Sequence, residues 1–443
     1  MQERRGRKKG RSSRSVETRK LLLAAAARQF REKGYAASTL KEIGAAAGIE
    51  SASLYYYFAS KEDILEDVLD LGLRQALDVV SAVYRDCEER EAGFRETFHA
   101  MIYAHLCCIL IDGDFAAATM RTFSTLHGAL RIRHRPSFQA YGDLWEKLLA
   151  RSQAAGDVRD DVDLSLLQRL IVGALNWTVE WFDPTRYPLR DFSEKSANLL
   201  LDGMLSPANK VPTWTDEPLL VDPASEIEKG HTKSKRTRTV IILSASQVLC
   251  ERGYDRCTLR RIAETAGVKA GSLYYHFSSR EEIIDEVLAL GLRGITDGVG
   301  AVWDNDSEFP DHGSRLAAGI RAHMLHLYAS SEFISTNIRV YGQLPKEISL
   351  RHRPSRQAYT AVWDRSLNRA QADGDLRADL DLISLRQLML GALNWTVLWF
   401  DPERETAQNF RSLDEVIAAQ RILFLEGIAT RKAANRAETQ QST

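Results

Sequence analysis

Apolar residues recur every three to four positions through most of this chain, and that spacing predicts helices. Leu22, Ala26 and Phe30 follow one another at intervals of four, and Gly34 would end their helix. The long segments further along contain few prolines and no strict alternation of apolar and polar residues. The pattern therefore predicts an all-α protein.

The same pattern occurs twice. Residues 51–58 (Ser-Ala-Ser-Leu-Tyr-Tyr-Tyr-Phe) recur as residues 270–277 (Ala-Gly-Ser-Leu-Tyr-Tyr-His-Phe), 219 positions later. Residues 133–137 (Arg-His-Arg-Pro-Ser) recur as residues 351–355, 218 positions later. A period of half a chain is the signature of a repeated unit. It indicates that the whole chain is a tandem duplication.

Each repeat begins with a pattern typical of a helix-turn-helix. A two-turn helix leads to Gly48, where a tight turn needs unusual backbone angles, and then to a short third helix. Leu54 and Phe58 are four residues apart and should face inward, which turns Tyr55 and Tyr56 outward. The pattern predicts a head whose short helix presents tyrosines to a partner.

Caps are predicted at two helices of this head. Thr39 and Glu42 predict a capping box at the second helix, which the other copy lacks because Arg261 replaces the glutamate. A serine is the expected N-cap of the fourth helix, and Lys61 follows it. A cation there opposes the helix dipole, so we expect Lys61, and Arg280 in the second copy, to contact a phosphate.

The charge is unevenly distributed, although the net charge of the chain is only −1. Residues 1–62 carry a net charge of +8 and residues 229–283 one of +6, which leaves −15 for the remainder. Both basic segments hold a copy of the helix-turn-helix pattern. This distribution predicts two separate surfaces for a polyanion such as DNA.

Composition shifts divide the chain into seven segments. Residues 1–15 lack apolar periodicity, which predicts a disordered basic arm that follows phosphates or serves only as a solubilising tail. Four prolines in residues 206–235 predict a linker. The expected order is arm 1–15, head 1 at 16–62, body 1 at 63–205, linker 206–235, head 2 at 236–281, body 2 at 282–430 and tail 431–443.

On these residues, each half resembles the TetR family of one-component bacterial repressors. The resemblance covers nearly the whole chain, twice, and is most specific in the head, where a turn glycine, an aromatic run and a trailing cation coincide. It implies two all-α units, each with a three-helix DNA-binding domain and a larger helical domain that binds a small molecule and dimerises. Since both units occur in one chain, we expect an intramolecular pseudo-dimer that acts as a transcriptional repressor.

The resemblance also implies which residues face double-stranded DNA. Hydroxyls and short side chains would approach base edges, while tyrosines and cations would hold phosphates. In head 1 these residues are Thr39, Lys41, Ser51, Ala52, Ser53, Tyr55, Tyr56, Tyr57 and Lys61. In head 2 they are Thr258, Arg260, Lys269, Ala270, Gly271, Ser272, Tyr274, Tyr275, His276 and Arg280. Any single tyrosine could instead belong to the core.

The two heads differ where they would read DNA. Glu50 precedes one short helix and Lys269 the other, and Tyr57 corresponds to His276. A homodimer must read two identical half-sites, whereas a fused chain need not. We therefore expect an asymmetric operator. The alternative is a module in which only one head binds DNA, because Glu50 repels phosphates.

The bodies should pair and hold an effector. Apolar positions in residues 164–177 and 199–204 predict helices that form a four-helix bundle with residues 382–400 and 413–428. Arginines before a proline could hold an anionic group or lie in a solvated loop. Four tryptophans favour the core or the interface over a ligand site. The candidate ligand-binding residues are Arg133, Trp177, Trp181, Arg351, Trp395 and Trp399.

The effector class rests on the resemblance alone. The sequence Asn-Trp-Thr-Val followed by Trp-Phe-Asp-Pro resembles TetR relatives that control fatty-acid, aromatic or steroid breakdown, some of which sense acyl-CoA thioesters. The expected effector is an acyl-CoA or another anionic catabolite. Two chains could also pair crosswise into a four-headed assembly.

Other classes of protein are disfavoured. Five cysteines without CxxC pairs fit a cytoplasmic protein, and no apolar run reaches the ~20 residues of a membrane span. A helical enzyme is the alternative from another class, but Walker, GxSxG and HExxH motifs are missing, so we expect no catalytic residues and no cofactor. His323 and His326 could be metal ligands, yet only His105 matches them in the first half, so no metal is expected.

Overall fold

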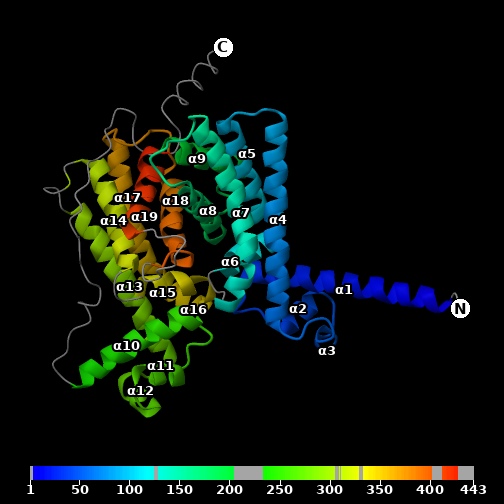
Figure 1. Cartoon of the computed structure of the whole chain (residues 1–443). Helices are drawn as coiled ribbons and strands as arrows, with labels where there is room; N and C mark the ends of the chain where they lie inside the picture. The colour runs from blue at the N-terminus through cyan, green and yellow to red at the C-terminus, as the bar shows by residue number, and fades with distance from the viewer. Residues whose placement is uncertain are drawn as a thin grey trace.

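The computed structural model describes residues 3–123, 128–203, 233–304, 309, 311–328, 333–401 and 412–427. All the elements in these residues are helices, so the all-α prediction is confirmed. Two helical bodies lie side by side, and a smaller head extends from the lower end of each (Figure 1). Residues 204–232, which include most of the predicted linker, and residues 428–443, which include the predicted tail, lie outside the described part.

The first half contains nine α-helices in its described residues. These are α1 (Glu3–Lys33), α2 (Leu40–Ala46), α3 (Ser51–Leu54), α4 (Lys61–Glu89), α5 (Phe94–Cys107), α6 (Asp114–Phe123), α7 (Gly128–Ala154), α8 (Leu164–Asn176) and α9 (Leu189–Asp202). A π-helical turn, η1 (Cys108–Asp112), follows α5, and a 3-10 turn, η2 (Trp177–Glu180), follows α8.

The second half repeats this order. Its helices are α10 (Lys233–Arg252), α11 (Leu259–Ala266), α12 (Ala270–His276), α13 (Arg280–Trp303), α14 (His312–Tyr328), α15 (Phe333–Val340), α16 (Lys346–Arg351), α17 (Arg353–Ala372), α18 (Leu382–Trp395) and α19 (Leu413–Arg421). Short turns η4 (Tyr341–Gln343), η5 (Thr396–Leu398) and η6 (Ile422–Glu426) join or extend them.

The prediction of a disordered basic arm is wrong for the backbone of residues 3–15, because α1 begins at Glu3. The arm consists mainly of Arg, Lys and Ser, without a proline to stop a helix. Once the apolar part of α1 packs in the head, each further residue adds one backbone hydrogen bond at little cost. At the other boundary, α10 already begins at Lys233, inside the predicted linker.

The two halves pair through the predicted helices. α8 packs against α18, α9 contacts α18, and α19 contacts α8, as the expected four-helix interface requires (Figure 1). A Cβ atom on Gly173 would lie 2.9 Å from Trp395, and one on Gly391 would lie 2.7 Å from Trp177. The small residue of each half therefore receives the tryptophan of the other, so the contact is made twice with the roles exchanged.

Two arginines close the same interface at its outer end. Nη1 of Arg159 donates to Glu426 at 2.8 Å, and Nη1 of Arg377 donates to the carbonyl oxygen of Gly203 at 2.9 Å. One continuous apolar core runs through both bodies, while each head has a core of its own. The fused chain therefore folds as a pseudo-dimer.

In the described residues, no single helix is both long and apolar enough to cross a membrane. Phe94–Ile111 and Asp114–Phe123 reach such a length and composition only as a pair, and they meet at 89°.

Candidate nucleic-acid interface and pocket residues

The second helix of head 1 is held by its predicted capping box. The backbone N–H of Glu42 donates to Oγ1 of Thr39 at 3.2 Å, and the backbone N–H of Thr39 donates to the Glu42 carboxylate at 3.1 Å. Nζ of Lys33 pairs with the same carboxylate at 3.0 Å. Head 2 has the cap at Thr258 without the box. Both expectations from the sequence are confirmed.

The turn after this helix depends on glycine in both heads. Gly48 has φ +68° and Gly267 has φ +64°, in the left-handed region that other residues rarely adopt. This conformation ends α2 and α11 and directs the chain into the short helices α3 and α12. The turn thereby sets the angle at which each short helix is presented.

The short helices expose their tyrosines. Tyr55 and Tyr56 are 62% and 82% exposed, whereas Leu54 and Phe58 are buried. In head 2 the equivalent tyrosines, Tyr274 and Tyr275, are 63% and 81% exposed, and Leu273 and Phe277 are buried. The predicted inward and outward faces are confirmed in both heads, and the agreement between the heads shows that the scaffold is the same.

Most of the other predicted contact residues are exposed or half-buried. The exposed ones are Thr39, Lys41, Ser53, Thr258, Arg260, Lys269, Ala270 and Gly271. Those that are half-buried are Tyr57, Ser272 and His276. The side chains of Ser51 and Ala52, at the start of α3, lie outside the described part of the structure. Each head thus exposes hydroxyls, tyrosines and at least one cation among its predicted contact residues.

Lys61 does not need a phosphate as its partner. Its ammonium group donates to the carbonyl oxygens of Tyr35, Ala36 and Ser38 at 2.9, 3.4 and 3.0 Å, and it lies 4.3 Å above the Tyr35 ring. These acceptors use all three ammonium protons, and burial lowers the pKa of Lys61. In this structure the cation therefore fastens the loop between α1 and α2, and its contact with a phosphate stays a prediction.

Arg280 takes the equivalent position in head 2. Its Nη1 donates to the carbonyl oxygen of Cys257 at 3.4 Å, and its guanidinium lies 4.6 Å from the Tyr254 ring. Its Nε donates to Glu281 at 3.0 Å. The sequence predicts a cation directly after the N-cap serine of the fourth helix. It does not predict that the loop before the second helix supplies a carbonyl oxygen to that cation.

The two heads touch each other. Nη2 of Arg256 in head 2 pairs with Glu62 of head 1 at 2.9 Å. The reciprocal pair is missing, because Ala37 stands in head 1 where head 2 has Arg256. A Cβ atom on Gly34 would lie 2.8 Å from the carbonyl oxygen of Gly342 in body 2. Head 1 is therefore in contact with the second half of the chain as well as with its own body.

The arginines predicted to hold an anion are used elsewhere. Arg133 of α7 pairs with Glu66 of α4, and Arg351 pairs with Asp285 of α13. Both arginine side chains are more than half exposed. Neither lines one of the two pockets described below, and an anion site at these arginines stays a prediction. They tie the body to the long helix that leads to the head.

The four tryptophans lie in apolar surroundings. Trp177 and Trp395 form the interface with Gly391 and Gly173. Trp181 packs edge-on against Phe192, with ring centroids 5.4 Å apart. Trp399 lies under Arg169 of the other half, with the guanidinium 5.2 Å from its ring. All four lie in core or interface positions, and Trp177 and Trp395 also line a pocket.

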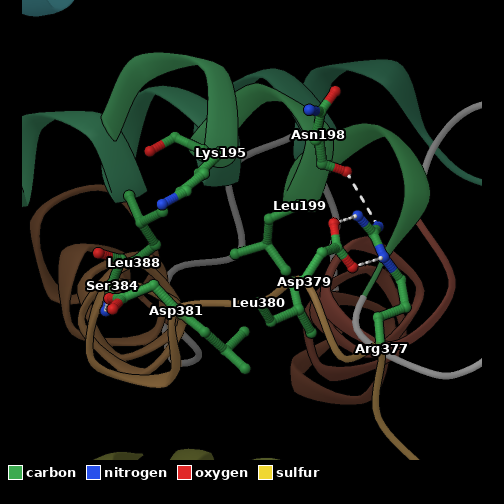
Figure 2. Close-up of a pocket in the computed structure, with 11 residues that line it drawn as sticks. Lys195, Asn198, Leu199, Arg377, Asp379, Leu380, Asp381, Ser384 and Leu388 are labelled. Atoms are coloured by element: carbon green, nitrogen blue, oxygen red, sulfur yellow. Dashed lines mark hydrogen bonds and ion pairs between the residues drawn. The ribbon is translucent and has the colours of Figure 1, made fainter. Parts of the chain in front are cut away.

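Two pockets lie between the halves. Figure 2 shows the first, between α9 and α18, where Arg377 pairs with Asp379 at 2.7 Å and approaches the carbonyl oxygen of Asn198. It has about 340 Å³ of empty space that opens to solvent, and a rim of Lys195, Asp381 and Ser384. The second lies beside Trp177 and Trp395.

The second pocket is asymmetric. It contains Glu180, whereas the equivalent residue of the second half is Leu398. Burial raises the pKa of Glu180, and Arg121, with its Nε 4.0 Å away, partly offsets this. The same Arg121 donates from Nη1 to the carbonyl oxygen of Arg31 near the end of α1.

A buried polar cluster occurs in each body, around the histidines His105 and His323 that the sequence suggested only as metal ligands. In body 1, Nδ1 of His105 and the hydroxyl of Tyr141 are 2.5 Å apart, and in body 2 His323 and Tyr359 are also 2.5 Å apart. The one available signal was the 218-residue offset that relates these residues, since histidine, tyrosine and their spacing recur.

The architecture, the helix-turn-helix heads and their duplication agree with comparisons with known proteins. The family model described as "Bacterial regulatory proteins, tetR family" matches residues 22–68 and 241–287. The model described as "Tetracyclin repressor-like, C-terminal domain" matches residues 91–204 and 310–408. The chain belongs to the TetR family. It contains the head and the body of a TetR protein twice, in the same order.

Individual TetR relatives match about half of this chain. The HTH-type transcriptional repressor KstR2 of Rhodococcus jostii (strain RHA1) is 29% identical over 202 residues, which is 45% of this chain and 95% of the relative. The fatty acid metabolism regulator protein of Bacillus subtilis (strain 168) is 24% identical over 185 residues, 41% of this chain and 93% of the relative. Each of these proteins therefore corresponds to one unit of the fused chain.

Two solved structures are also similar to parts of this chain. AibR in complex with isovaleryl coenzyme A and operator DNA is 21% identical, has a TM-score of 0.38, and covers 41% of this chain and 96% of AibR. The structure of the ketosteroid transcriptional regulator KstR2 of Mycobacterium tuberculosis is 29% identical, has a TM-score of 0.32, and covers 40% of this chain and 89% of that protein.

Proposed function

We propose that this TetR protein is a cytoplasmic, non-enzymatic regulator that represses transcription by covering a promoter with both heads. The observation that supports this most strongly is the pair of short helices whose tyrosines are 62–82% exposed on otherwise well-packed heads. Large aromatic side chains are seldom left in water without a partner, and here the same two are exposed in both copies. The heads also carry the two basic segments of an otherwise acidic chain.

The side chains on each head suit a DNA duplex. A short helix fits the major groove, and the small side chain of Ser53 and the lack of a side chain at Gly271 allow the backbone to come near the base edges. The hydroxyls of the exposed tyrosines and the ammonium groups of Lys41 and Lys269 can then reach phosphates on either side. Because Lys61 is held within head 1, it belongs to the support of this surface and not to its contacts.

The two heads are proposed to read unlike half-sites. Glu50 occupies the N-cap position of α3, and Lys269 occupies the N-cap position of α12. Both side chains are exposed. A carboxylate here repels a phosphate and can accept a hydrogen bond from a cytosine amino group, whereas an ammonium group attracts phosphate or guanine. The operator is therefore expected to be asymmetric.

The bodies are proposed to bind a small-molecule effector that changes DNA binding. Membership of the family supports an effector in general, and the motif shared with regulators of fatty-acid or steroid breakdown supports an acyl-CoA or another anionic catabolite. Since Arg133 and Arg351 are paired with carboxylates, a different part of the molecule must receive any negative charge.

The test of the function is to sequence the DNA fragments that the purified full chain retains from a pool of random DNA. We expect one recurrent sequence with two unlike half-sites, and binding that weakens as salt increases. Failure to enrich any sequence, at low as well as at moderate salt, would refute the function. A perfect palindrome would refute the asymmetric operator alone.

The one-headed alternative is tested by separate substitutions. Tyr55→Ala and Tyr274→Ala each remove one exposed tyrosine, which leaves the core intact. If both heads bind, each variant loses affinity for the selected DNA. Loss in only one of them supports the alternative. Tyr103→Ala is the control, because Tyr103 is an exposed tyrosine on α5 of body 1.

A further inference from the structure

The loop after the first helix of each head begins with the same turn but carries different side chains. Gly34 and Gly253 both adopt left-handed φ angles, +80° and +76°, and a tyrosine follows each of them. In head 1 the next two residues, 36 and 37, are alanines, whereas in head 2 they are Asp255 and Arg256. Only the second loop therefore presents charges at this place.

These charges lie against the start of α4 in head 1. Nη2 of Arg256 is 2.9 Å from Oε1 of Glu62. Burial lowers the pKa of Lys61, and the carboxylates of Asp255 and Glu62 partly offset this. An acidic and a basic residue of head 2 therefore face a basic and an acidic residue of head 1. Complementary charges of this kind fix the register of two surfaces.

The reverse ion pairs cannot form. The start of α13 in head 2 carries the equivalent cation and carboxylate, Arg280 and Glu281, but the alanines at positions 36 and 37 offer them no charge. Nε of Arg280 donates instead to Glu281 of its own head at 3.0 Å. A homodimer would make such a contact on both sides of its axis or on neither. The contact between the heads is therefore one-sided, as only a fused chain permits.

One short turn of body 2 supports both loops. The backbone N–H of Tyr254 donates to Oε1 of Gln343 at 2.9 Å, and Nε2 of Gln343 donates to the carbonyl oxygen of Arg339 at 3.1 Å. The neighbouring residue, Gly342, lies so close to head 1 that a Cβ atom on Gly34 would be 2.8 Å from its carbonyl oxygen. Consecutive residues of η4 thus contact the loops of both heads, so the heads rest on one support.

A fixed separation of the heads limits the DNA on which both can bind. In head 1, α1 packs against α2 and α2 against α3, and in head 2, α10 packs against α11 and α11 against α12. Each loop is therefore connected through packed helices to the short helix of its head. One added base pair moves the far half-site by about 3.4 Å and turns it by about 35°. Heads held in one position cannot follow such a shift, whereas heads that move freely can.

We propose that Asp255 and Arg256 are positioning residues, which hold head 2 against the start of α4 in head 1 and thereby select the length of DNA between the two half-sites. This deepens the proposed function and rests on it. The short helices read the sequence of each half-site, and the contact between the heads sets the distance at which the two half-sites must lie.

The expected effect of this contact is modest, because water reaches the ion pair. The side chains of Arg256 and Glu62 are 51% and 42% exposed, and exposed ion pairs contribute little. Loss of the pair is therefore expected to change the discrimination between DNA lengths by about two- to fivefold. The change should be larger at low salt, since salt screens exposed charges.

The test compares the selected DNA with four copies in which the segment between the half-sites is one or two base pairs longer or shorter. Fluorescence anisotropy of the full chain at fixed salt gives the ratio of the dissociation constant on each copy to that on the selected DNA. A lost phosphate contact weakens binding to every copy alike and leaves these ratios unchanged. We expect the unmodified chain to bind the selected length most tightly, and Arg256→Ala to lower the ratios about two- to fivefold.

An exchange of charges separates the ion pair from general effects on head 2. Arg256→Glu alone places a carboxylate beside Glu62 and should lower the ratios further than Arg256→Ala does. The double variant Arg256→Glu, Glu62→Arg should restore them, because the attraction returns with the signs reversed. Arg252→Ala is the matched control and should leave the ratios unchanged, since Arg252 is an exposed arginine of the same head whose Nε lies 3.9 Å from Glu251 of its own helix.

The proposal is overturned if the unmodified chain binds all five DNA lengths equally well, if Arg256→Ala leaves the ratios unchanged, or if the double exchange does not restore them. These outcomes leave the proposed function standing, because each is measured on DNA that the chain has selected. Failure of the unmodified chain to select any DNA would refute the function itself, and this proposal with it.

Discussion

The two heads of this chain share a scaffold but not a surface. Their exposed tyrosines agree in exposure to within 1%, and both short helices follow a left-handed glycine. At the start of the short helix, however, Glu50 stands in one head and Lys269 in the other. The bodies also combine repeated and divergent residues. Both contain a buried histidine–tyrosine pair, whereas Phe98 of the first body is replaced by Leu316 at the equivalent position of the second.

This contrast shows what the fusion permits. In a homodimer each substitution appears on both sides of the axis, so the two heads cannot diverge. In a single chain the packing that builds a head is retained twice, while the residues that face a partner can change in one copy only. Pairing within one chain also proceeds at an effective concentration of about millimolar, so the halves do not separate on dilution.

The largest expected effect is a dependence of folding stability on pH, and it tests whether the two bodies are alike. An unfolded histidine takes up a proton near pH 6.5, whereas folded His105 and His323 have pKa values of about 3. Between these values the unfolded chain binds more protons, so stability falls as the pH is lowered from about 6.5. Each histidine contributes a loss of roughly 1.4 kcal/mol per pH unit.

The measurement is the free energy of unfolding in urea from pH 7 to pH 4.5. In the double variant His105→Gln, His323→Gln, the dependence of the unfolding free energy on pH should correspond to about two fewer protons bound by the unfolded chain. Each single variant should remove half of that difference. Unequal slopes for the two single variants would show that the clusters are not equivalent.

The next effect tests the equivalence of the interface. Gly391→Ala would place a Cβ atom 2.7 Å from Trp177, and Gly173→Ala would place one 2.9 Å from Trp395. Each is expected to destabilise the chain by about 2 kcal/mol through overpacking, measured as a fall in the urea midpoint. Gly300→Ala on α13 is the control, because its Cβ would meet no described atom within 4 Å, and it should be neutral or slightly stabilising.

A smaller effect addresses the difference between the heads. Lys269→Glu replaces an exposed cation at the start of α12 and should lower the affinity for the selected DNA about tenfold. Glu50→Lys should raise the affinity several-fold and make the two half-sites more alike. Binding is measured by fluorescence anisotropy at fixed salt, with Lys195→Glu on α9 as the control. Equal responses of the two heads would mean that this position does not distinguish them.

The smallest effect separates support from contact within head 1. Lys61→Met leaves three carbonyl oxygens without their donor, so it should cost about 1 kcal/mol of stability and leave the salt dependence of DNA binding unchanged. Lys41→Met should do the opposite. It should not lower the stability, but it should reduce the slope of the logarithm of DNA affinity against the logarithm of salt concentration by about one. A lower salt dependence of DNA binding in Lys61→Met would instead indicate that Lys61 contacts a phosphate.

Features set by short-range periodicity could be predicted from the sequence. The capping box of Thr39 and Glu42 spans three residues, and the outward Tyr55 and Tyr56 follow from the inward Leu54. The pairing helices were recognised in the same way, because α8 and α18 carry broad apolar faces. The duplication helped, since each feature could be checked in a second copy.

Features that depend on distant partners could not be predicted. Lys61 finds its acceptors 23 to 26 residues earlier, and Arg133 finds Glu66 67 residues earlier. The ring of Tyr141 reaches His105 across 36 positions. Periodicity places a side chain on a face of a helix, but it does not say which other helix covers that face. The sequence alone therefore suggests anionic partners for Lys61 and Arg133, and it does not reveal that Tyr141 contacts His105.

The central claim is that one chain covers two neighbouring and unlike half-sites. The most direct measurement is a hydroxyl-radical footprint of the full chain on its selected DNA. Two protected segments of different sequence are expected about one helical turn apart. The protection of one should be lost in Tyr55→Ala and that of the other in Tyr274→Ala. A single short protected segment, or two segments of identical sequence, would contradict it.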